Sequence, residues 1–309
     1  MKYIKGITFA AFAGRGVLSK KETYESLDAL VERTNADFII LVPAGYQETA
    51  QSENIDYTSR GTIGDEELIN MINYAHEKGI RVALKPTVNC SNGTWRAHIN
   101  FFDEDVPCEP KWSKWFASYT EFQLHFAKIA QETGCEMFIP GCEMVQSERR
   151  EAEWRKLIAD IRTVYTGTVS YNTDKYQEHN VKWWDAVDVI SSSGYYPIGD
   201  WENQLDRIEK VVKKYNKPFF FAESGCMSTK GSPYVPNDWG VKGEIDLQGQ
   251  ADWYEEMFRA CAKRDWVEGF ALWDWRSILY PLAEADKEPG YDIYGKPAER
   301  VVARVYGEK

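Results

Sequence analysis

The sequence predicts an α/β fold, a single (β/α)8 TIM barrel that covers residues 1–309. Eight strand-like segments alternate with helix-like segments in strict order along the chain. No GxGxxG or P-loop motif follows any of these strands, and such a motif is the usual reason to prefer an open doubly wound sheet. The length of 309 residues and the apolar content of 43% suit one large core, and no linker, repeat or low-complexity stretch divides the chain.

The expected strands are short runs that are rich in apolar residues. The run DFIILV at 37–42 is continuous, which is typical of a strand that is covered on both faces. In chain order, the expected strands are Tyr3–Phe9, Asp37–Val42, Arg81–Val88, Met137–Glu143, Thr168–Asn172, Asp188–Tyr195, Phe219–Glu223 and Gly269–Trp275.

The expected helices carry apolar residues at the spacing of one helical face. In the segment 201–215 this face holds Leu205, Ile208, Val211 and Val212, and Gly79 is a plausible stop for the second helix. A long loop is expected to hold residues 89–105. The expected helices are Thr23–Arg33, Asp65–Lys78, Lys111–Thr133, Glu148–Tyr165, a short stretch around His179–Trp184, Trp201–Tyr215, Gln248–Arg264 and Pro297–Tyr306.

Charge and cysteine content limit the expected partners and compartment. A net charge of −11 disfavours binding to nucleic-acid backbones or anionic membranes, because like charges repel each other. No run of 18 or more apolar residues is present, so we expect no transmembrane helix. Lys5 and Gly6 interrupt the N-terminal apolar stretch, which favours a first strand over a signal peptide. The six cysteines include no CxxC pair, and we expect reduced thiols in a cytoplasmic protein.

Aromatic residues are unusually frequent and point to a carbohydrate ligand. The chain has 12 Trp, 18 Tyr and 14 Phe, which together make 14% of its residues. Many of these rings must pack in the core, as at the helical spacing of residues 115–126. Twelve tryptophans nevertheless exceed what packing usually needs, and indole rings stack well on the flat apolar faces of sugars.

Two glutamates end two of the expected strands, and they are the candidate catalytic pair. Glu143 ends the fourth strand and Glu223 ends the seventh, each beside small residues. A carboxylate at the end of a buried strand is costly unless it is paired or used, so two of them predict a shared site. Across the mouth of one barrel they have the geometry of acid/base glycoside hydrolysis. The alternative is a structural role, in which each glutamate pairs with a buried Lys or Arg.

The other side chains at the expected strand ends are polar or aromatic. Because active sites of such barrels lie at the C-terminal ends of the strands, these side chains are candidate substrate-binding residues. We expect Trp273 to be a floor on which a sugar stacks, Tyr195 to donate to the nucleophile, and Lys85 to neutralise a carboxylate or bind a sugar hydroxyl. Packing is the alternative for each aromatic residue, and it is favoured for Trp275. The candidates are Lys85, Asn89, Trp95, Asn172, Tyr195, Tyr196, Asn237, Trp239, Trp273 and Asp274.

The histidines do not indicate a metal site. His76 and His125 fall on expected helices, and the sequence has no HExxH, HxH or clustered Asp/His motif. We therefore expect no catalytic metal and no cofactor.

Five segments, in the right order, together resemble glycoside hydrolase family 113, whose members are retaining β-1,4-mannanases on a (β/α)8 barrel. The resemblance implies that Glu143 is the acid/base and Glu223 the nucleophile. It also implies that Trp273 is the stacking platform, with Lys85, Asn89 and Tyr195 as hydrogen-bonding partners of the sugar. The segments are Leu84–Arg96 (LKPTVNCSNGTWR), Ile139–Met144 (IPGCEM), Gly194–Pro197 (GYYP), Phe221–Gly225 (FAESG) and Leu272–Trp275 (LWDW).

The chain departs from the family pattern at two places. Cys142 stands where many members of the wider clan have an Asn that binds the sugar 2-hydroxyl, and Thr87 and Asn89 stand where the strand-three motif often has the sequence KPHVD. Both changes touch sugar recognition more than mechanism. We expect an oligosaccharide substrate derived from β-mannan, because an intracellular enzyme would meet imported oligosaccharides and not polymeric mannan. The alternatives are a retaining glycosidase for another sugar, a non-catalytic sugar-binding barrel, and a barrel that uses both glutamates with a metal.

Overall fold

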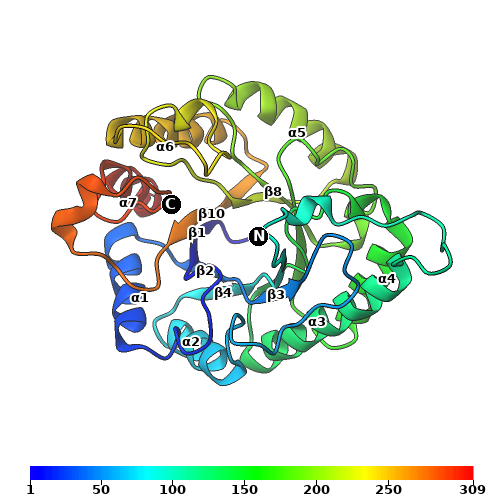
Figure 1. The fold of residues 1–309 in the computed structure, drawn as a ribbon. Helices are drawn as coiled ribbons and strands as arrows, with labels where there is room; N and C mark the ends of the chain where they lie inside the picture. The colour runs from blue at the N-terminus through cyan, green and yellow to red at the C-terminus, as the bar shows by residue number, and fades with distance from the viewer. Residues whose placement is uncertain (309) are drawn as a thin grey trace.

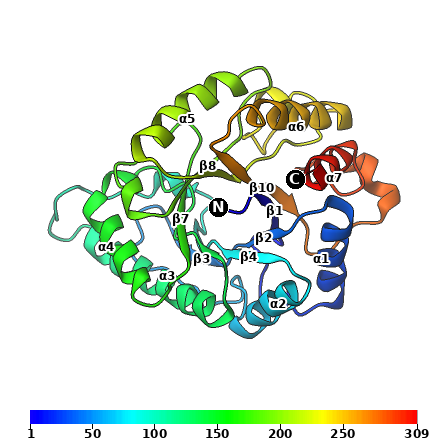
Figure 2. The ribbon, with the colours of Figure 1, turned by 180° about the vertical axis from the view of Figure 1, so that it is seen from behind.

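The computed structural model describes residues 1–308 and contains a closed barrel of eight parallel strands, which confirms the predicted fold. Each strand pairs with its neighbour in chain order, and the last closes on the first through a register that runs from Ile4 opposite Gly269 to Phe9 opposite Trp275. Figures 1 and 2 show the ring from its two sides. The barrel strands are β1 (Ile4–Phe9), β2 (Phe38–Leu41), β4 (Arg81–Leu84), β6 (Met137–Phe138), β7 (Thr168–Thr173), β8 (Val189–Ser193), β9 (Phe219–Glu223) and β10 (Val267–Trp275).

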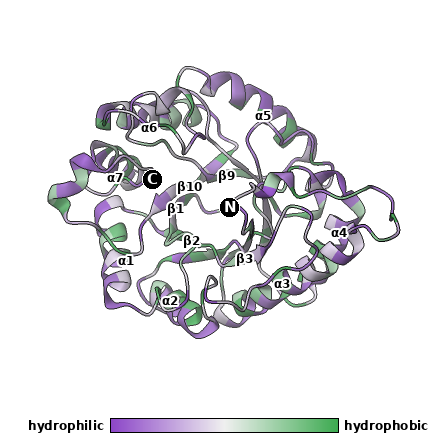
Figure 3. Ribbon diagram, in the orientation of Figure 1, coloured by the Kyte–Doolittle hydropathy of each residue, from purple (hydrophilic) through white to green (hydrophobic). Residues whose placement is uncertain are grey.

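Amphipathic helices surround the barrel because each one buries a single apolar face against the strands. In α5 the residues Leu205, Ile208 and Val212 are buried, as the spacing predicts. In Figure 3 the central strands are mainly green, whereas α5 is mainly purple on its outer side. No helix among residues 1–308 is long and apolar enough to cross a membrane. The helices are α1 (Lys21–Thr34), α2 (Asp65–Glu77), α3 (Trp112–Thr133), α4 (Glu151–Arg162), α5 (Trp201–Tyr215), α6 (Leu247–Cys261) and α7 (Pro297–Glu308).

The predicted short helix around His179–Trp184 is wrong. Between β7 and β8 the chain forms only a 3-10 turn, Trp184–Ala186. Two indoles cover the outside of the barrel here in place of a helix. Trp183 stacks on Trp154 with ring centroids 4.9 Å apart, and Trp184 is equally buried. Flat rings therefore fill the space that a helix would otherwise occupy.

The predicted strand 81–88 is broken into two strands. Pro86 lacks a backbone N–H and interrupts the ladder after β4, as does Pro43 after β2. Beyond these prolines the two segments pair again as a separate parallel sheet of β3 (Ala44–Gln47) and β5 (Thr87–Cys90). The break carries Asn89, which was expected in a loop, to the mouth of the barrel on a hydrogen-bonded strand.

The barrel interior changes from apolar to polar along its axis. The interior away from the C-terminal ends of the strands is filled by a separate apolar cluster that includes Phe38, Ile40 and Phe220. Toward the C-terminal ends of the strands, fully buried polar side chains such as Lys85 and Asn172 take over. Buried polar groups need partners, so this end of the barrel is where a hydrogen-bonded site is expected.

Replacing Gly141 with Ala is expected to destabilise the fold by about 1–3 kcal/mol, because the backbone there has a φ of 149°, which L-residues rarely adopt. A Cβ would also lie 2.9 Å from both Trp154 and Tyr171. Gly79→Ala is the matched control, since Gly79 has a positive φ but open space around it. Thermal unfolding measures both variants. Equal losses would show that crowding at Gly141 contributes nothing.

Candidate active site

A cavity of about 970 Å³ opens at the C-terminal ends of the barrel strands. Both glutamates lie in its wall, and several predicted substrate-binding residues surround them. Tyr195 and Trp273 come from the ends of β8 and β10, and Asn89 comes from β5. The loops contribute the rest of the predicted lining residues, which are Trp95, Asn237 and Trp239.

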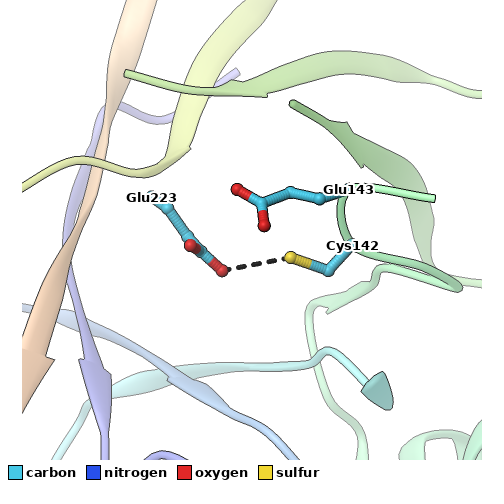
Figure 4. Close-up of side chains that lie close together, drawn as sticks. All are labelled: Cys142, Glu143 and Glu223. Carbon is cyan, nitrogen blue, oxygen red and sulfur yellow. Dashed lines mark hydrogen bonds between the residues drawn. The ribbon is translucent and has the colours of Figure 1, made fainter. Parts of the chain in front are cut away.

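Glu143 and Glu223 approach each other across this cavity. Their facing carboxylate oxygens lie within 4.8 Å of each other, and both residues are buried. Figure 4 shows the two side chains converging from opposite sides, with Cys142 beside them. Glu223 ends β9, whereas Glu143 follows β6 on a segment where its own φ is 53°. This left-handed backbone turns the Glu143 side chain into the cavity.

Donors surround the carboxylate of Glu143 on both oxygens. Ser193 Oγ donates to Oε1 at 2.8 Å, while Trp95 Nε1 and Arg96 Nη1 donate to Oε2 at 3.2 and 3.1 Å. Burial and, next, the negative charge of Glu223 raise the pKa of Glu143, and they outweigh the opposing charge of Arg96. Glu143 is therefore the member of the pair that retains a proton more readily.

The carboxylate of Glu223 is held in its ionised form. Lys85 Nζ and Cys142 Sγ donate to Oε1 at 2.5 and 3.2 Å, and the Tyr195 hydroxyl donates to Oε2 at 3.1 Å. Burial alone would raise the pKa of Glu223, but the charge and hydrogen bond of Lys85, together with the charge of Arg96 and the hydrogen bond of Cys142, outweigh burial and lower it. The two glutamates therefore have pKa values shifted in opposite directions, which is the usual signature of separate acid and base roles.

Asn172 links the donors of the two carboxylates through hydrogen bonds. Contrary to the prediction, it does not line the cavity. Its Oδ1 accepts from Lys85 Nζ at 3.1 Å, and its Nδ2 donates to Ser193 Oγ at 3.0 Å. The residue is fully buried, and both ends of its amide are used within the protein. The prediction that Asn172 binds substrate is therefore wrong. Its amide orients the donors of both glutamates.

Tyr196 and Asp274 do not line the cavity either, contrary to prediction. The hydroxyl of Tyr196 donates to the buried Glu178 at 2.8 Å, outside the barrel. Asp274 is not part of the cavity wall; burial and the nearby Asp292 raise its pKa to about 7. Each directly follows a residue, Tyr195 or Trp273, that does line the cavity.

The family model of Glycoside Hydrolase Family 113 matches residues 7–296. The chain belongs to Glycoside Hydrolase Family 113. A comparison with curated proteins gives no match. Among solved structures, a chain described as a family 113 β-1,4-mannanase in a complex shares 55% identity with a TM-score of 0.99, and the match covers 100% of both chains.

A second family member and a more distant barrel extend this comparison. The family 113 β-mannanase AaManA from Alicyclobacillus acidocaldarius, in complex with ManMIm, is 42% identical with a TM-score of 0.96, covering 100% of this chain and 98% of that one. The β-glucuronidase of Ruminococcus gnavus shares 14% identity at a TM-score of 0.63, covering 99% of this chain and 50% of that one. At that identity the likeness shows the fold alone.

Several residues at the site of this family 113 chain were not among the predicted ones. Arg96 and Ser193 contact Glu143 directly, and Asp174 lines the cavity beside it. Each had a detectable signal, because Arg96 follows the predicted Trp95 and the other two lie at the ends of β7 and β8. Phe12 and Tyr291 also line the cavity, but they lie on long loops where the sequence pattern carries no directional information.

Cys142 and the two glutamates together offer three ligand atoms that all lie within 4.8 Å of one another. Their surroundings make them a poor fit for a metal ion. Lys85 and Arg96 already bind the carboxylates, so a divalent cation would be placed beside two positive charges. Burial and, next, the charge of Glu223 raise the pKa of the Cys142 thiol well above its usual range, whereas metal binding needs the thiolate.

Proposed function

We propose that the protein is a retaining glycoside hydrolase that cleaves β-1,4-mannosidic bonds in mannan-derived oligosaccharides by double displacement. The observation that carries the proposal is the pair Glu143 and Glu223, with facing oxygens within 4.8 Å and pKa values shifted in opposite directions. Membership of family 113 supports the reaction class. The two relatives described as β-mannanases, at 55% and 42% identity, support the sugar.

The separation of the carboxylates favours retention over inversion. Retaining enzymes place the two carboxyl groups about 5–5.5 Å apart, whereas inverting enzymes leave about 6.5–9.5 Å to admit a water molecule. The close approach of Glu143 and Glu223 leaves no such room between the carboxylates. Glu223 is then the nucleophile and Glu143 the acid/base.

In the first step Glu223 attacks the anomeric carbon while Glu143 protonates the departing glycosidic oxygen. Lys85 and Tyr195 keep Glu223 ionised and oriented for attack. Once Glu223 is esterified its negative charge is gone, and with it one cause of the raised pKa of Glu143. Glu143 therefore loses its proton more readily, and in the second step it activates the water that releases the sugar.

The substrate-side roles follow from the cavity lining. We assign Trp273 as the stacking platform for the cleaved sugar, and Trp239, which is 70% exposed, as an aromatic surface farther out. Cys142 contacts Glu223 and does not line the cavity, so it cannot take over the 2-hydroxyl contact of the Asn it replaces. Asn89 and Arg96, which do line the cavity, are polar groups that can supply it.

The direct test is incubation with mannotriose through mannohexaose, with the products resolved over time and the first anomer identified by NMR. We expect shorter mannooligosaccharides with the β-anomer formed first. The α-anomer would contradict retention, and turnover of gluco- or xylooligosaccharides in place of manno-oligosaccharides would contradict the sugar assignment. Binding without any release of reducing sugar would indicate a non-catalytic barrel, and loss of activity with chelator would indicate metal-assisted chemistry.

The pH profile of kcat/KM on mannotetraose is expected to be bell-shaped. Activity rises with pH as Glu223 ionises, and its lowered pKa places this limb below the usual range of a glutamate. Activity falls at higher pH as Glu143 loses its proton, and its raised pKa moves that limb upward. Lys85→Gln removes the charge that lowers the pKa of Glu223, so the acid limb should move to higher pH. An unchanged acid limb would contradict the assignment.

We also propose that residues 1–309 form one catalytic domain that acts in the cytoplasm on short oligosaccharides. The six cysteines are unpaired, and five of them are buried, which supports a reducing compartment. Fractionation of the source cells with an antibody to the protein tests the location.

A further inference from the structure

Strand β7 holds the backbone on both sides of Glu143. The Glu143 N–H donates to the carbonyl of Asn172 at 2.8 Å, and the next N–H, that of Met144, donates to the hydroxyl of Tyr171 at 3.2 Å. Between these two bonds lies the left-handed conformation of Glu143, with a φ of 53°. For a residue other than glycine this conformation costs on the order of 1–3 kcal/mol, so it persists only where its surroundings hold it.

The Tyr171 hydroxyl is held in turn by Glu148. A hydroxyl has one proton, and because that of Tyr171 accepts from Met144 it is free to donate to Glu148 Oε1, at 2.8 Å. Thr173 Oγ1 donates to the same carboxyl oxygen at 2.7 Å, and Trp183 Nε1 donates to the Glu148 carbonyl at 3.0 Å. The chain of contacts from Glu148 through Tyr171 to Met144 therefore fixes the direction of each hydrogen bond.

Glu148 is a buried carboxyl group that the proposed reaction does not use. It is 3% exposed, does not line the cavity, and its Oε2 has no hydrogen-bond partner. Burial raises its pKa to about 8. The hydrogen bonds of Thr173 and Tyr171 lower the pKa, and the charges of Asp174 and Glu178 raise it. Burying a carboxyl oxygen without a hydrogen-bond partner costs free energy of folding, so a functional role of Glu148 is expected.

We infer that Tyr171 and Glu148 are positioning residues, which act through the Met144 N–H to hold Glu143 where its carboxyl meets the departing glycosidic oxygen. The inference rests on the proposed function, because it assigns a supporting pair to the proposed acid/base. Neither residue touches the substrate. Their loss should therefore impair proton donation by Glu143, while the nucleophile and the sugar-binding surface stay in place.

Tyr171→Phe tests this inference by removing one hydroxyl and keeping the ring that packs against Trp154 and Trp183. We expect kcat/KM on mannotetraose to fall about 10–100-fold, because misplaced general-acid catalysis loses part of its usual 10²–10⁴-fold effect. On 2,4-dinitrophenyl β-mannobioside, whose leaving group needs no protonation, kcat/KM should stay within about 3-fold of wild type. Equal losses on the two substrates would overturn the inference, as would no loss on either.

Glu148 provides a second pair of variants. Glu148→Leu removes the acceptor of the Tyr171 hydroxyl and should reproduce the substrate-dependent loss of Tyr171→Phe. Glu148→Gln keeps an acceptor oxygen, so its kcat/KM on mannotetraose should stay within about 3-fold of wild type. Equal losses in the two Glu148 variants would overturn the assigned role of Glu148.

Tyr165→Phe is the matched control for a lost buried hydroxyl. Tyr165 is also buried, and its hydroxyl donates to the Cys135 carbonyl at 2.7 Å, on the segment that precedes β6. We expect a similar loss of thermal stability with unchanged kcat/KM on both substrates. A loss of mannotetraose activity equal to that of Tyr171→Phe would show a general packing effect and overturn the inference. A wild-type protein inactive on both substrates would instead refute the proposed function.

Discussion

Replacing Glu223 with Gln is expected to lower kcat on mannotetraose by about 10⁵-fold or more, an effect of the size seen when other enzymes lose their nucleophile. The amide is not a nucleophile and cannot form the glycosyl ester. It keeps the shape of the side chain and leaves an oxygen that accepts from Lys85, whose ammonium is fully buried. The barrel should therefore stay folded, and the loss should lie in the chemistry alone.

Glu223→Ala is the informative companion to this variant. Both variants leave the buried ammonium of Lys85 without its anion, and breaking a buried ion pair costs about 3–5 kcal/mol. Glu223→Ala also removes the oxygen that accepts from Lys85, so it should lie at the upper end of that range, whereas the Gln amide keeps an acceptor. We expect both variants to be inactive and the Ala variant to unfold at a lower temperature than the Gln variant. Initial rates and thermal unfolding measured on the same samples make the comparison. Turnover by Glu223→Gln above a few per cent of wild type would refute the nucleophile assignment.

Replacing Glu143 with Ala is expected to lower kcat/KM on mannotetraose by about 10²–10⁴-fold, the range that general acid–base catalysis contributes. With 2,4-dinitrophenyl β-mannobioside the first step needs no proton, so the glycosyl-enzyme should form and then accumulate for lack of a base. A burst of dinitrophenol followed by a slow steady state would report this. The same variant should lose the alkaline limb of the pH profile, because the group that titrates there is gone.

Added azide distinguishes this outcome from general damage. The anion needs no base, so it should attack the accumulated glycosyl-enzyme and restore the steady-state rate, with β-mannobiosyl azide as the product. The α-azide, or no rescue at all, would contradict the assignment of Glu143 as acid/base. Glu223→Ala treated in the same way serves as the control, because it cannot form the glycosyl-enzyme.

The sequence predicted the barrel and the pair because both depend on strong local signals. Apolar runs and helical spacing set the order of the strands, and family membership confirms the suspected resemblance. A glutamate that ends a buried run is recognisable in the sequence itself, as at Phe219–Glu223. The barrel topology then brings the ends of β6 and β9 to one mouth, since parallel strands share their C-terminal edge.

Which of two adjacent side chains faces the cavity was harder to predict, because beyond the end of a strand the residue pattern carries no information on direction. Tyr195 contacts Glu223, whereas the adjacent Tyr196 contacts Glu178 outside the barrel, and both residues lie just beyond the end of β8. The replacement of a helix by Trp183 and Trp184 was equally hard to predict. In each case the local pattern allowed two arrangements and packing selected one.

By itself, the sequence determined that a closed barrel forms and that one carboxylate follows its fourth strand while another ends its seventh. Only the tertiary structure decided in which direction the pKa of each carboxylate is shifted, because the hydrogen-bond partners come from distant segments of the chain. Lys85 reaches Glu223 across 138 positions of the chain, and Ser193 reaches Glu143 across 50. Burial and charge act through space, so the opposite pKa shifts of two identical side chains exist only once the barrel has closed.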